Sequence, residues 1–165
     1  MTVMQDSHVS LQGHRSLAGP KTTLCPVRIG LADGRVVNAE IFLLSDGMRP
    51  GGVTSVEGTL AVEREFLPVR MDDRDTLVRC QAIRFLEVAP DSPGAVGIEG
   101  LGGSFDVVTL RIDSGETLSG ILRFPAPAES MRMSDVFNWP GRFLILSTGE
   151  RLILVAKAHI VEASF

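Results

Sequence analysis

Apolar and polar positions alternate along two neighbouring stretches of the chain. Every second residue is apolar in residues 25–31 and again in residues 37–43, which is the period of a β-strand. Asp33-Gly34 lies between them, and this dipeptide is typical of tight hairpin turns because glycine readily takes a positive φ. The pattern predicts a β-hairpin whose inward-facing residues are Val27, Ile29, Leu31, Val37, Ala39, Ile41 and Leu43.

The same plan recurs later in the chain, with Gly115 in the place of Gly34. Residues 108–112 and 118–124 alternate in the same way, and Ser114-Gly115 supplies the turn. After a shorter middle connection the match resumes, and it pairs Phe66-Leu67 with Phe143-Leu144, Arg74 with Arg151, Leu77-Val78 with Leu154-Val155, and Ile83 with Ile160. The chain therefore contains one module twice.

Three more strands are expected in each module. They cover residues 66–70, 76–80 and 83–88 in the first, with a polar turn at residues 72–75. In the second they cover residues 143–147, 151–156 and 160–165. Five short strands with turn signals at this spacing favour a small barrel, which removes the exposed edges of an open sheet. The predicted fold class is mainly β, with two five-stranded small barrels in tandem.

A short helical turn is expected between the second and third strands of each module. In the second module, Ser134-Asp135 is suited to cap the turn and Pro140 to end it. In the first, residues 54–65 are expected to do the same over a longer stretch.

The composition changes along the chain and sets the expected domain boundaries. Residues 1–23 are polar, lack periodicity, and are predicted to form a flexible tail. The first barrel is expected over residues 24–88 and the second over residues 106–165. Residues 89–105 are rich in Gly, Pro, Ser and Ala, which predicts a linker, with a functional glycine-rich loop as the alternative.

The amino-acid composition and net charge indicate which classes of protein the chain fits. Apolar residues make up 44% of the chain and charged residues 22%, which is typical of a globular protein. The net charge of −4 argues against broad non-specific binding to nucleic acid, although a local basic patch stays open. No run of apolar residues has the length of a membrane span, and the first residues lack the pattern of a signal peptide. We therefore expect a cytoplasmic protein in which Cys25 and Cys80 are buried thiols.

No constellation of residues predicts catalysis, a cofactor or a metal site. His8, His14 and His159 have no partner at metal-ligand spacing, and His159 is expected on the surface or rim. A stretch that imitates a phosphate-binding loop ends in Lys21, but Pro20 removes a backbone N–H that phosphate would need. The protein is expected not to be an enzyme.

The stretch SGETLSGIL, residues 114–122, resembles the first motif of the Sm-like proteins. Gly115 forms the turn and Gly120, five residues on, lets the strand bend around a small barrel. The first module has Gly34 and Ala39 at these places. The resemblance implies a five-stranded Sm-like (or SH3-like) barrel, and assembly in which the fourth and fifth strands of neighbouring barrels pair.

The family also binds RNA through an Asn in the loop after the second strand and an Arg before the last strand. The second module has Asp135-Val-Phe-Asn138, one residue shorter than the family motif, and Arg79 precedes the last strand of the first module. Lys157 stands near the corresponding place in the second module. The resemblance therefore implies an RNA site formed by Arg79, Asn138 and Lys157.

Two functions follow from these observations. The first is a non-enzymatic binding or scaffolding protein that forms homo-oligomers through strand edges; the alternative is an Sm-like RNA-binding protein. The loop holding Phe137, Trp139 and Pro140 is either a partner site or, through Trp139, a cap on the barrel mouth. The expected interaction surface comprises Phe137, Trp139, Leu152, Leu154 and Ile160, with Phe143 contributing apolar burial. The sequence leaves open which partner is bound and whether the barrels exchange strands.

Overall fold

The structure is a computed structural model that describes residues 22–44, 55–95, 103–124 and 132–165. The tail was predicted over residues 1–23. Residues 1–21 lie outside the described residues, and Thr23 already belongs to the first strand. Within the described residues the chain has ten strands and two short helices, so the expected mainly β class is confirmed. Neither helix has the length and hydrophobicity that crossing a membrane requires.

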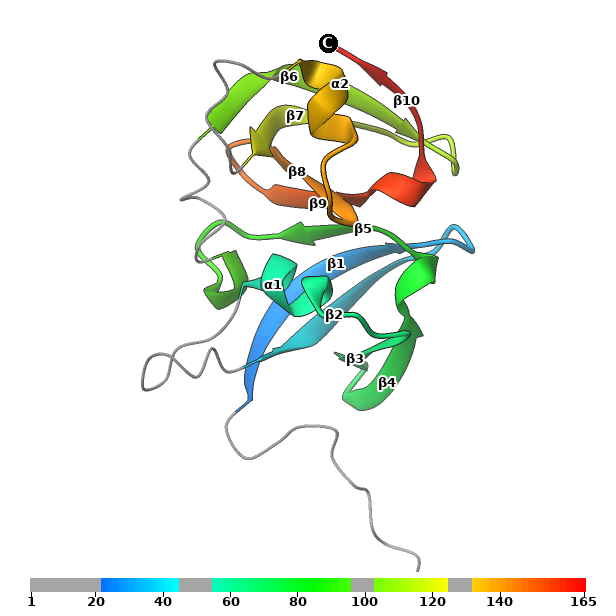
Figure 1. Cartoon of the computed structure of the whole chain (residues 1–165). Coiled ribbons are helices and arrows are strands. Elements are labelled where there is room, and N and C mark those ends of the chain that lie inside the picture. Colours follow the sequence, from blue (N-terminus) through cyan, green and yellow to red (C-terminus); the bar gives the residue numbers. More distant parts are fainter. Residues whose placement is uncertain (1–21, 45–54, 96–102, 125–131) are drawn as a thin grey trace, which may run out of the picture.

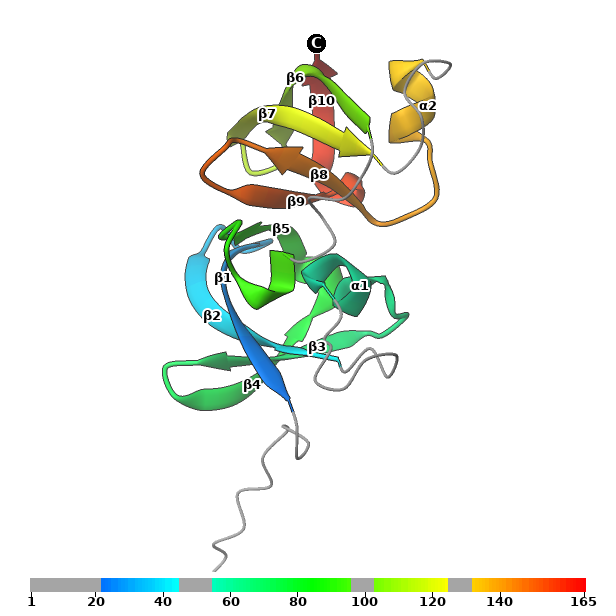
Figure 2. The ribbon, with the colours of Figure 1, turned by 90° about the vertical axis from the view of Figure 1, so that its left-hand side faces the viewer.

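The strands of the first half are β1 (Thr23–Leu31), β2 (Val36–Leu43), β3 (Phe66–Met71), β4 (Arg74–Arg79) and β5 (Ile83–Val88). Those of the second half are β6 (Gly103–Ile112), β7 (Thr117–Phe124), β8 (Phe143–Ser147), β9 (Leu152–Ala156) and β10 (Ile160–Ser164). Helix α1 (Val56–Ala61) lies between β2 and β3, and α2 (Met133–Phe137) lies between β7 and β8. Both helices lie on the same side of the molecule (Figures 1 and 2).

All ten strands belong to one antiparallel sheet in the order β10-β6-β7-β8-β9-β5-β1-β2-β3-β4. The order of the first half, β5-β1-β2-β3-β4, recurs in the second half as β10-β6-β7-β8-β9. The repeat found in the sequence is therefore also a repeat of strand pairing. The halves join through β5 and β9, which lie side by side in the middle of the molecule (Figure 1), and β4 and β10 lie at its two ends (Figures 1 and 2).

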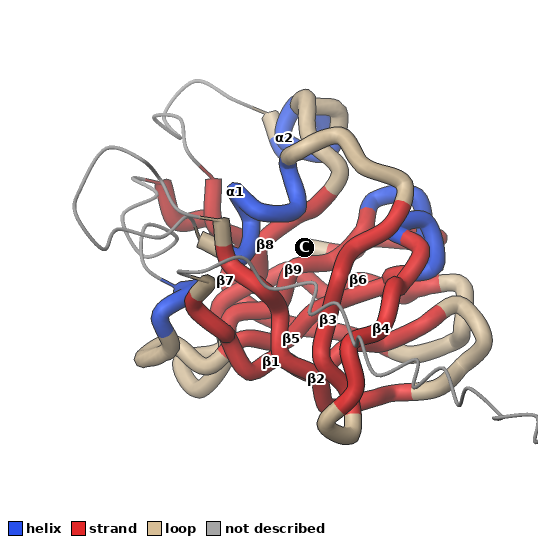
Figure 3. Tube along the Cα trace, turned by 90° about the horizontal axis from the view of Figure 1, so that it is seen from below, coloured by secondary structure: helices blue, strands red, loops and turns tan. Residues whose placement is uncertain are grey.

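The turns follow the expected positions with one correction. Gly34 and Gly115 take positive φ values of 86° and 88°, as hairpin turns require. The turn between β3 and β4 is shorter than the predicted residues 72–75, because Met71 pairs directly with Arg74. Asp72 and Asp73 alone span it, with φ values of 48° and 59°, so two non-glycine residues occupy the left-handed region (Figure 3 shows this turn from below the molecule).

Each helix is capped locally. The Ser55 hydroxyl accepts a hydrogen bond of 3.0 Å from the Gly58 N–H at the start of α1. In α2 the expected cap at Ser134 is wrong, because Arg132 is the N-terminal capping residue. The Asp135 carboxylate, three residues on, accepts a hydrogen bond of 3.1 Å from the Arg132 N–H and so supports the first turn.

The hydrophobic interior consists of two clusters, and each of them contains side chains from both halves of the chain. The first is built mainly on β1–β5 and α1, but it also contains Ile145, Leu152 and Leu154 from the second half. The second is built on β6–β9 and α2, but it contains Phe85 from β5. Each half therefore contributes to the interior of the other across the β5–β9 contact.

Part of the predicted linker packs against the first cluster. A short 3-10 turn, Pro93–Ala95, follows β5, and both Gly94 and Ala95 are buried. A Cβ at Gly94 would lie 2.5 Å from both the Cys25 sulfur and a Val56 methyl carbon, so glycine is needed at this contact. Strand β6 begins at Gly103, which leaves residues 96–102 outside the described part of the chain. Cys25 and Cys80 are both buried and free, as expected.

Candidate functional site

The contact between β5 and β9, called the seam below, has a defined antiparallel register. Phe85 pairs with Val155, Leu86 with Leu154, Glu87 with Ile153 and Val88 with Leu152. Because β5 is the fifth strand of its half and β9 the fourth of the other, the seam joins unlike edges of two equivalent halves. This pairing shows how one half receives the edge of another.

The side chains of the seam alternate between the two interiors. Leu86 and Leu154 are fully buried in the first cluster, together with Val88 and Leu152. Phe85, one residue before Leu86, points to the other face and is buried in the second cluster. The seam is thus closed by apolar burial on both faces of the sheet.

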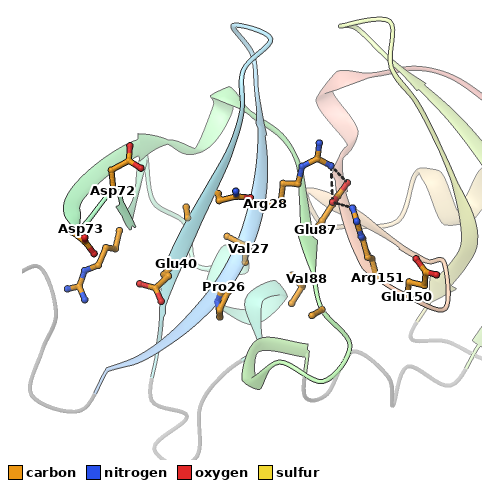
Figure 4. A pocket seen from close by; sticks show the side chains of 14 residues that line it. Pro26, Val27, Arg28, Glu40, Asp72, Asp73, Glu87, Val88, Glu150 and Arg151 are labelled. Carbon is orange, nitrogen blue, oxygen red and sulfur yellow. Dashed lines mark hydrogen bonds and ion pairs between the residues drawn. The ribbon is translucent and has the colours of Figure 1, made fainter.

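A carboxylate held by two arginines crosses the seam on the sheet surface. Glu87 accepts hydrogen bonds at 3.1 Å from Arg28 of β1 and forms an ion pair of 2.6 Å with Arg151, which immediately precedes β9 (Figure 4). The Glu87 side chain is only 10% exposed. Since Arg28 and Arg151 come from different halves, this cluster ties the halves together by charge-assisted hydrogen bonds.

A second polar cluster closes the other end of the seam. The His159 ring lies 2.7 Å from the Asp113 carboxylate through Nδ1 and 2.9 Å from the Gln81 carbonyl oxygen through Nε2. Asp113 also forms an ion pair of 2.6 Å with Arg84 of β5. Both partners of the His159 ring are acceptors, so both bonds form together only when both ring nitrogens carry a proton.

The charge of Asp113 is favoured by this arrangement. The hydrogen bond from His159, with the nearby charges of His159 and Arg84, holds the pKa of Asp113 below its usual value of 3.8. His159 therefore links the two halves, whereas the sequence placed it on the surface or rim. The sequence offers no signal for this contact, since Gln81 and Asp113 are far from His159 along the chain.

The outer strands β4 and β10 are the edges equivalent to those of the seam. In the repeat, Leu77 of β4 corresponds to Leu154, and Phe165, next to β10, corresponds to Val88. Leu154 and Val88 are buried, whereas Leu77 is 56% exposed and Phe165 is 74% exposed. Val161 of β10 is exposed as well. Each outer edge therefore has one position, Leu77 or Phe165, where an apolar side chain is exposed and its equivalent in the seam is buried.

The residues of the expected interaction surface are divided among different environments. Leu152 and Leu154 are buried in the seam, where they contact the interior of the first half. Phe137 and Ile160 are partly buried against the second cluster. Trp139 is 44% exposed and meets Phe124 edge to face, with ring centroids 5.2 Å apart. Phe143 packs, partly buried, against the first cluster.

The three residues of the implied RNA site each have a partner within the chain. Arg79 forms an ion pair of 2.7 Å with Glu65, and the Asn138 amide donates to the Ser134 carbonyl at 2.9 Å. The Lys157 ammonium donates to the Trp139 carbonyl, which brings Lys157 close to the Asn138 loop. No interaction among the described residues joins Arg79 to the other two, and RNA binding stays a prediction.

Several hollows on the described surface lie beside the contact of the halves, and two of them have the following linings. A broad groove of about 620 Å³ runs over β1 and β2 beside the Glu87 cluster, with Glu40, Asp72, Asp73 and Glu150 on its rim (Figure 4). A smaller pocket of about 260 Å³ lies between α1 and the segment from α2 to β8. Within the described residues no group of three His, Cys, Asp or Glu side chains could hold a metal ion.

No family model matches the chain, and neither a curated protein nor a solved structure matches it. The geometry of the seam and of the outer edges is therefore the basis for the function proposed next.

Proposed function

We propose that the protein is a non-enzymatic scaffolding protein that assembles head to tail through its outer strands. In this proposal each half is a five-stranded small barrel of the Sm-like type, and β10 of one molecule pairs with β4 of the next. The observation that supports it most is the seam, in which the same kind of edges already pair within one chain.

The seam gives the register of the proposed contact. Replacing each residue of a seam pair by its equivalent in the repeat places Ala163 opposite Leu77, Glu162 opposite Val78 and Phe165 opposite Asp75. Phe165 and Leu77 are then diagonal neighbours on one face, near enough for an aromatic ring to reach a leucine. The unpaired main-chain groups of both edge strands would be satisfied at the same time.

The direction of assembly follows from the two unlike edges. A contact between β4 and β10 uses different surfaces of the two molecules, so each bound molecule keeps one free edge of each kind until a ring closes. Growth into rings or filaments is expected, instead of a closed symmetric dimer.

The outer contact is expected to be weaker than the seam. At the seam Phe85 fills the second interior, but its equivalent Glu162 is charged and forms an ion pair of 2.6 Å with Arg111. Asp75 stands where the seam has Leu152. Charged residues on edge strands limit uncontrolled pairing. We therefore expect association that depends on protein concentration.

Sedimentation velocity with single-edge variants tests this proposal. Leu77→Asp blocks β4 and leaves β10 intact, whereas Ala163→Asp blocks β10 and leaves β4 intact. Each variant alone should stay monomeric at concentrations at which the wild type forms larger species. An equimolar mixture should give a heterodimer and nothing larger, because the mixture has only one productive kind of contact.

A matched control places the same charge on an interior strand. Val107 of β6 is 61% exposed, similar to Leu77, and Val107→Asp should assemble like the wild type. A wild type that stays monomeric up to millimolar concentration would contradict the proposal. So would dimers formed by either single-edge variant alone, since these would show symmetric pairing.

A further inference from the structure

The smaller pocket lies at the contact between the two halves and has a largely apolar wall. Leu60 and Ala61 of α1 line it from the first half, and Phe124, Trp139 and Phe143 line it from the second. Pockets of this kind, apolar with a few polar groups, are the usual form of small-molecule sites and occur often where domains meet. Its volume of about 260 Å³ suits a small ligand.

Three cationic side chains, Arg123, Arg142 and Lys157, also line the pocket. None of them forms an ion pair with another described residue, whereas the arginines of the seam are all paired with carboxylates. Among the described residues Glu57 of α1 is the one acidic residue in the lining, and burial raises its pKa. The pocket is therefore locally positive in a chain whose net charge is −4.

The surroundings of Lys157 also favour the binding of an anion in this pocket. Its ammonium group donates one hydrogen bond to the Trp139 carbonyl and has capacity for two more. Burial lowers the pKa of Lys157, because removing an ammonium from water disfavours its charge. Arg142 lies over the Phe143 ring, 6.0 Å from its centre. An anion in the pocket would form ion pairs with these cationic side chains, which have no carboxylate partner among the described residues.

We propose that this pocket binds a small amphipathic carboxylate, with its head group at Lys157 and Arg142 and its apolar body against Leu60, Phe124 and Trp139. The head group would accept charge-assisted hydrogen bonds from the ammonium and guanidinium groups. The apolar body would gain from burial against the aromatic and aliphatic wall. This inference is independent of assembly through the outer strands.

Fluorescence of the pocket wall provides a direct test. Trp139 is the only tryptophan of the chain, which has no tyrosine, so intrinsic emission reports on this wall. Octanoate at low salt and below its micelle concentration should change the emission saturably, and calorimetry should give the same dissociation constant. Octylammonium, which has a chain of the same length and the opposite charge, should bind at least about tenfold more weakly, since tenfold corresponds to about 1.4 kcal/mol.

Charge-removing variants locate the head group. Lys157→Gln and Arg142→Gln should each weaken octanoate binding by about 10-fold or more, the loss expected for one hydrogen bond to a charged group. Arg142 has no side-chain hydrogen bond within the described residues, so its variant tests the pocket even if Lys157→Gln disturbs the Trp139 loop. Arg74→Gln removes the same charge from β4, outside this pocket, and should bind as the wild type does.

Three results would overturn the inference. One is the absence of a saturable response to octanoate in both fluorescence and calorimetry. The second is equal binding of octanoate and octylammonium, which would show that only the apolar chain is recognised. The third is octanoate binding that neither Lys157→Gln nor Arg142→Gln weakens.

Discussion

Phe85 of β5 lies directly over Gly30 of β1, its cross-strand partner. A Cβ at residue 30 would come within 2.2 Å of the Cε1 atom of the Phe85 ring, far closer than carbon atoms can approach. The absence of a side chain at Gly30 is what lets Phe85 take its place in the second interior. In the second half Arg111 stands at the position equivalent to Gly30, and its described cross-strand partners, Glu162 and Thr117, are not aromatic.

Substitution of Gly30 should therefore reduce stability. Gly30→Ala forces the Phe85 ring to move in a packed interior, and we expect the free energy of unfolding to fall by about 1–3 kcal/mol, as is typical of overpacking. Urea denaturation followed by circular dichroism measures this loss.

The double variant Gly30→Ala/Phe85→Leu serves as the control, because leucine leaves room for the new methyl group. Its loss should be smaller than the sum of the two single losses, which is the signature of direct contact. Additive losses would show that residues 30 and 85 do not act on each other.

The turn between β3 and β4 should gain stability from glycine. Asp73 has a φ of 59°, a conformation that costs an L-residue about 1–2 kcal/mol relative to the right-handed region but costs glycine almost nothing. We expect Asp73→Gly to raise the free energy of unfolding by about 0.5–1 kcal/mol.

Gly34, whose φ is 86°, allows the opposite substitution as a control, from glycine to a residue with a side chain. A Cβ there would meet no neighbouring atom, so Gly34→Ala should lose stability through backbone strain alone. If both substitutions shifted the urea midpoint in the same direction, the strain at Asp73 would not be the cause.

The contact of Asp113 with His159 should make stability depend on pH in acid. The folded pKa of Asp113 lies below its usual 3.8, so this carboxylate stabilises the fold above that value. The contribution is lost as the pH falls through the folded pKa. Asp113→Asn should therefore be less stable than the wild type at pH 5 to 6, and the difference should shrink below pH 3.8.

The contribution of His159 to this pH dependence can be separated from that of Arg84. In a His159→Gln background the main partner of Asp113 is lost, and the pH dependence of the Asp113→Asn difference should decrease while the Arg84 ion pair remains. Urea unfolding at several pH values measures all four proteins. An unchanged pH dependence would assign it to Arg84 instead.

The strands and hairpin turns were predictable because each depends on a local pattern. Alternation located β1, β2, β6 and β7, and the Asp33-Gly34 and Ser114-Gly115 dipeptides located two turns. The short helices were also expected, although the cap of α2 was misplaced because Asp135 acts at the third helical position and not at the cap.

The seam could not be predicted in the same way. The repeat shows which positions are equivalent, but not which strand edges meet within one chain. The Sm-like resemblance implied pairing of fourth and fifth strands and placed Leu152 and Leu154 on an interaction surface. It did not indicate that this pairing is made within one chain, where both residues fill the interior of the first half. Glu87 and His159 act across the seam, and no local motif marks them. The loss of the repeat at Gly30 and Arg111 is a further signal in the sequence, because it shows that the halves differ next to β5 and β10.

The exchange of side chains across the seam restricts how the two halves could be recombined. In a hybrid made of two first halves, Asp75 would take the place of Leu152 and put a carboxylate into an apolar interior. In a hybrid made of two second halves, Arg111 and Glu162 would replace Gly30 and Phe85 and bring an ion pair there instead. The halves share an architecture but have become complementary, and neither can substitute for its neighbour.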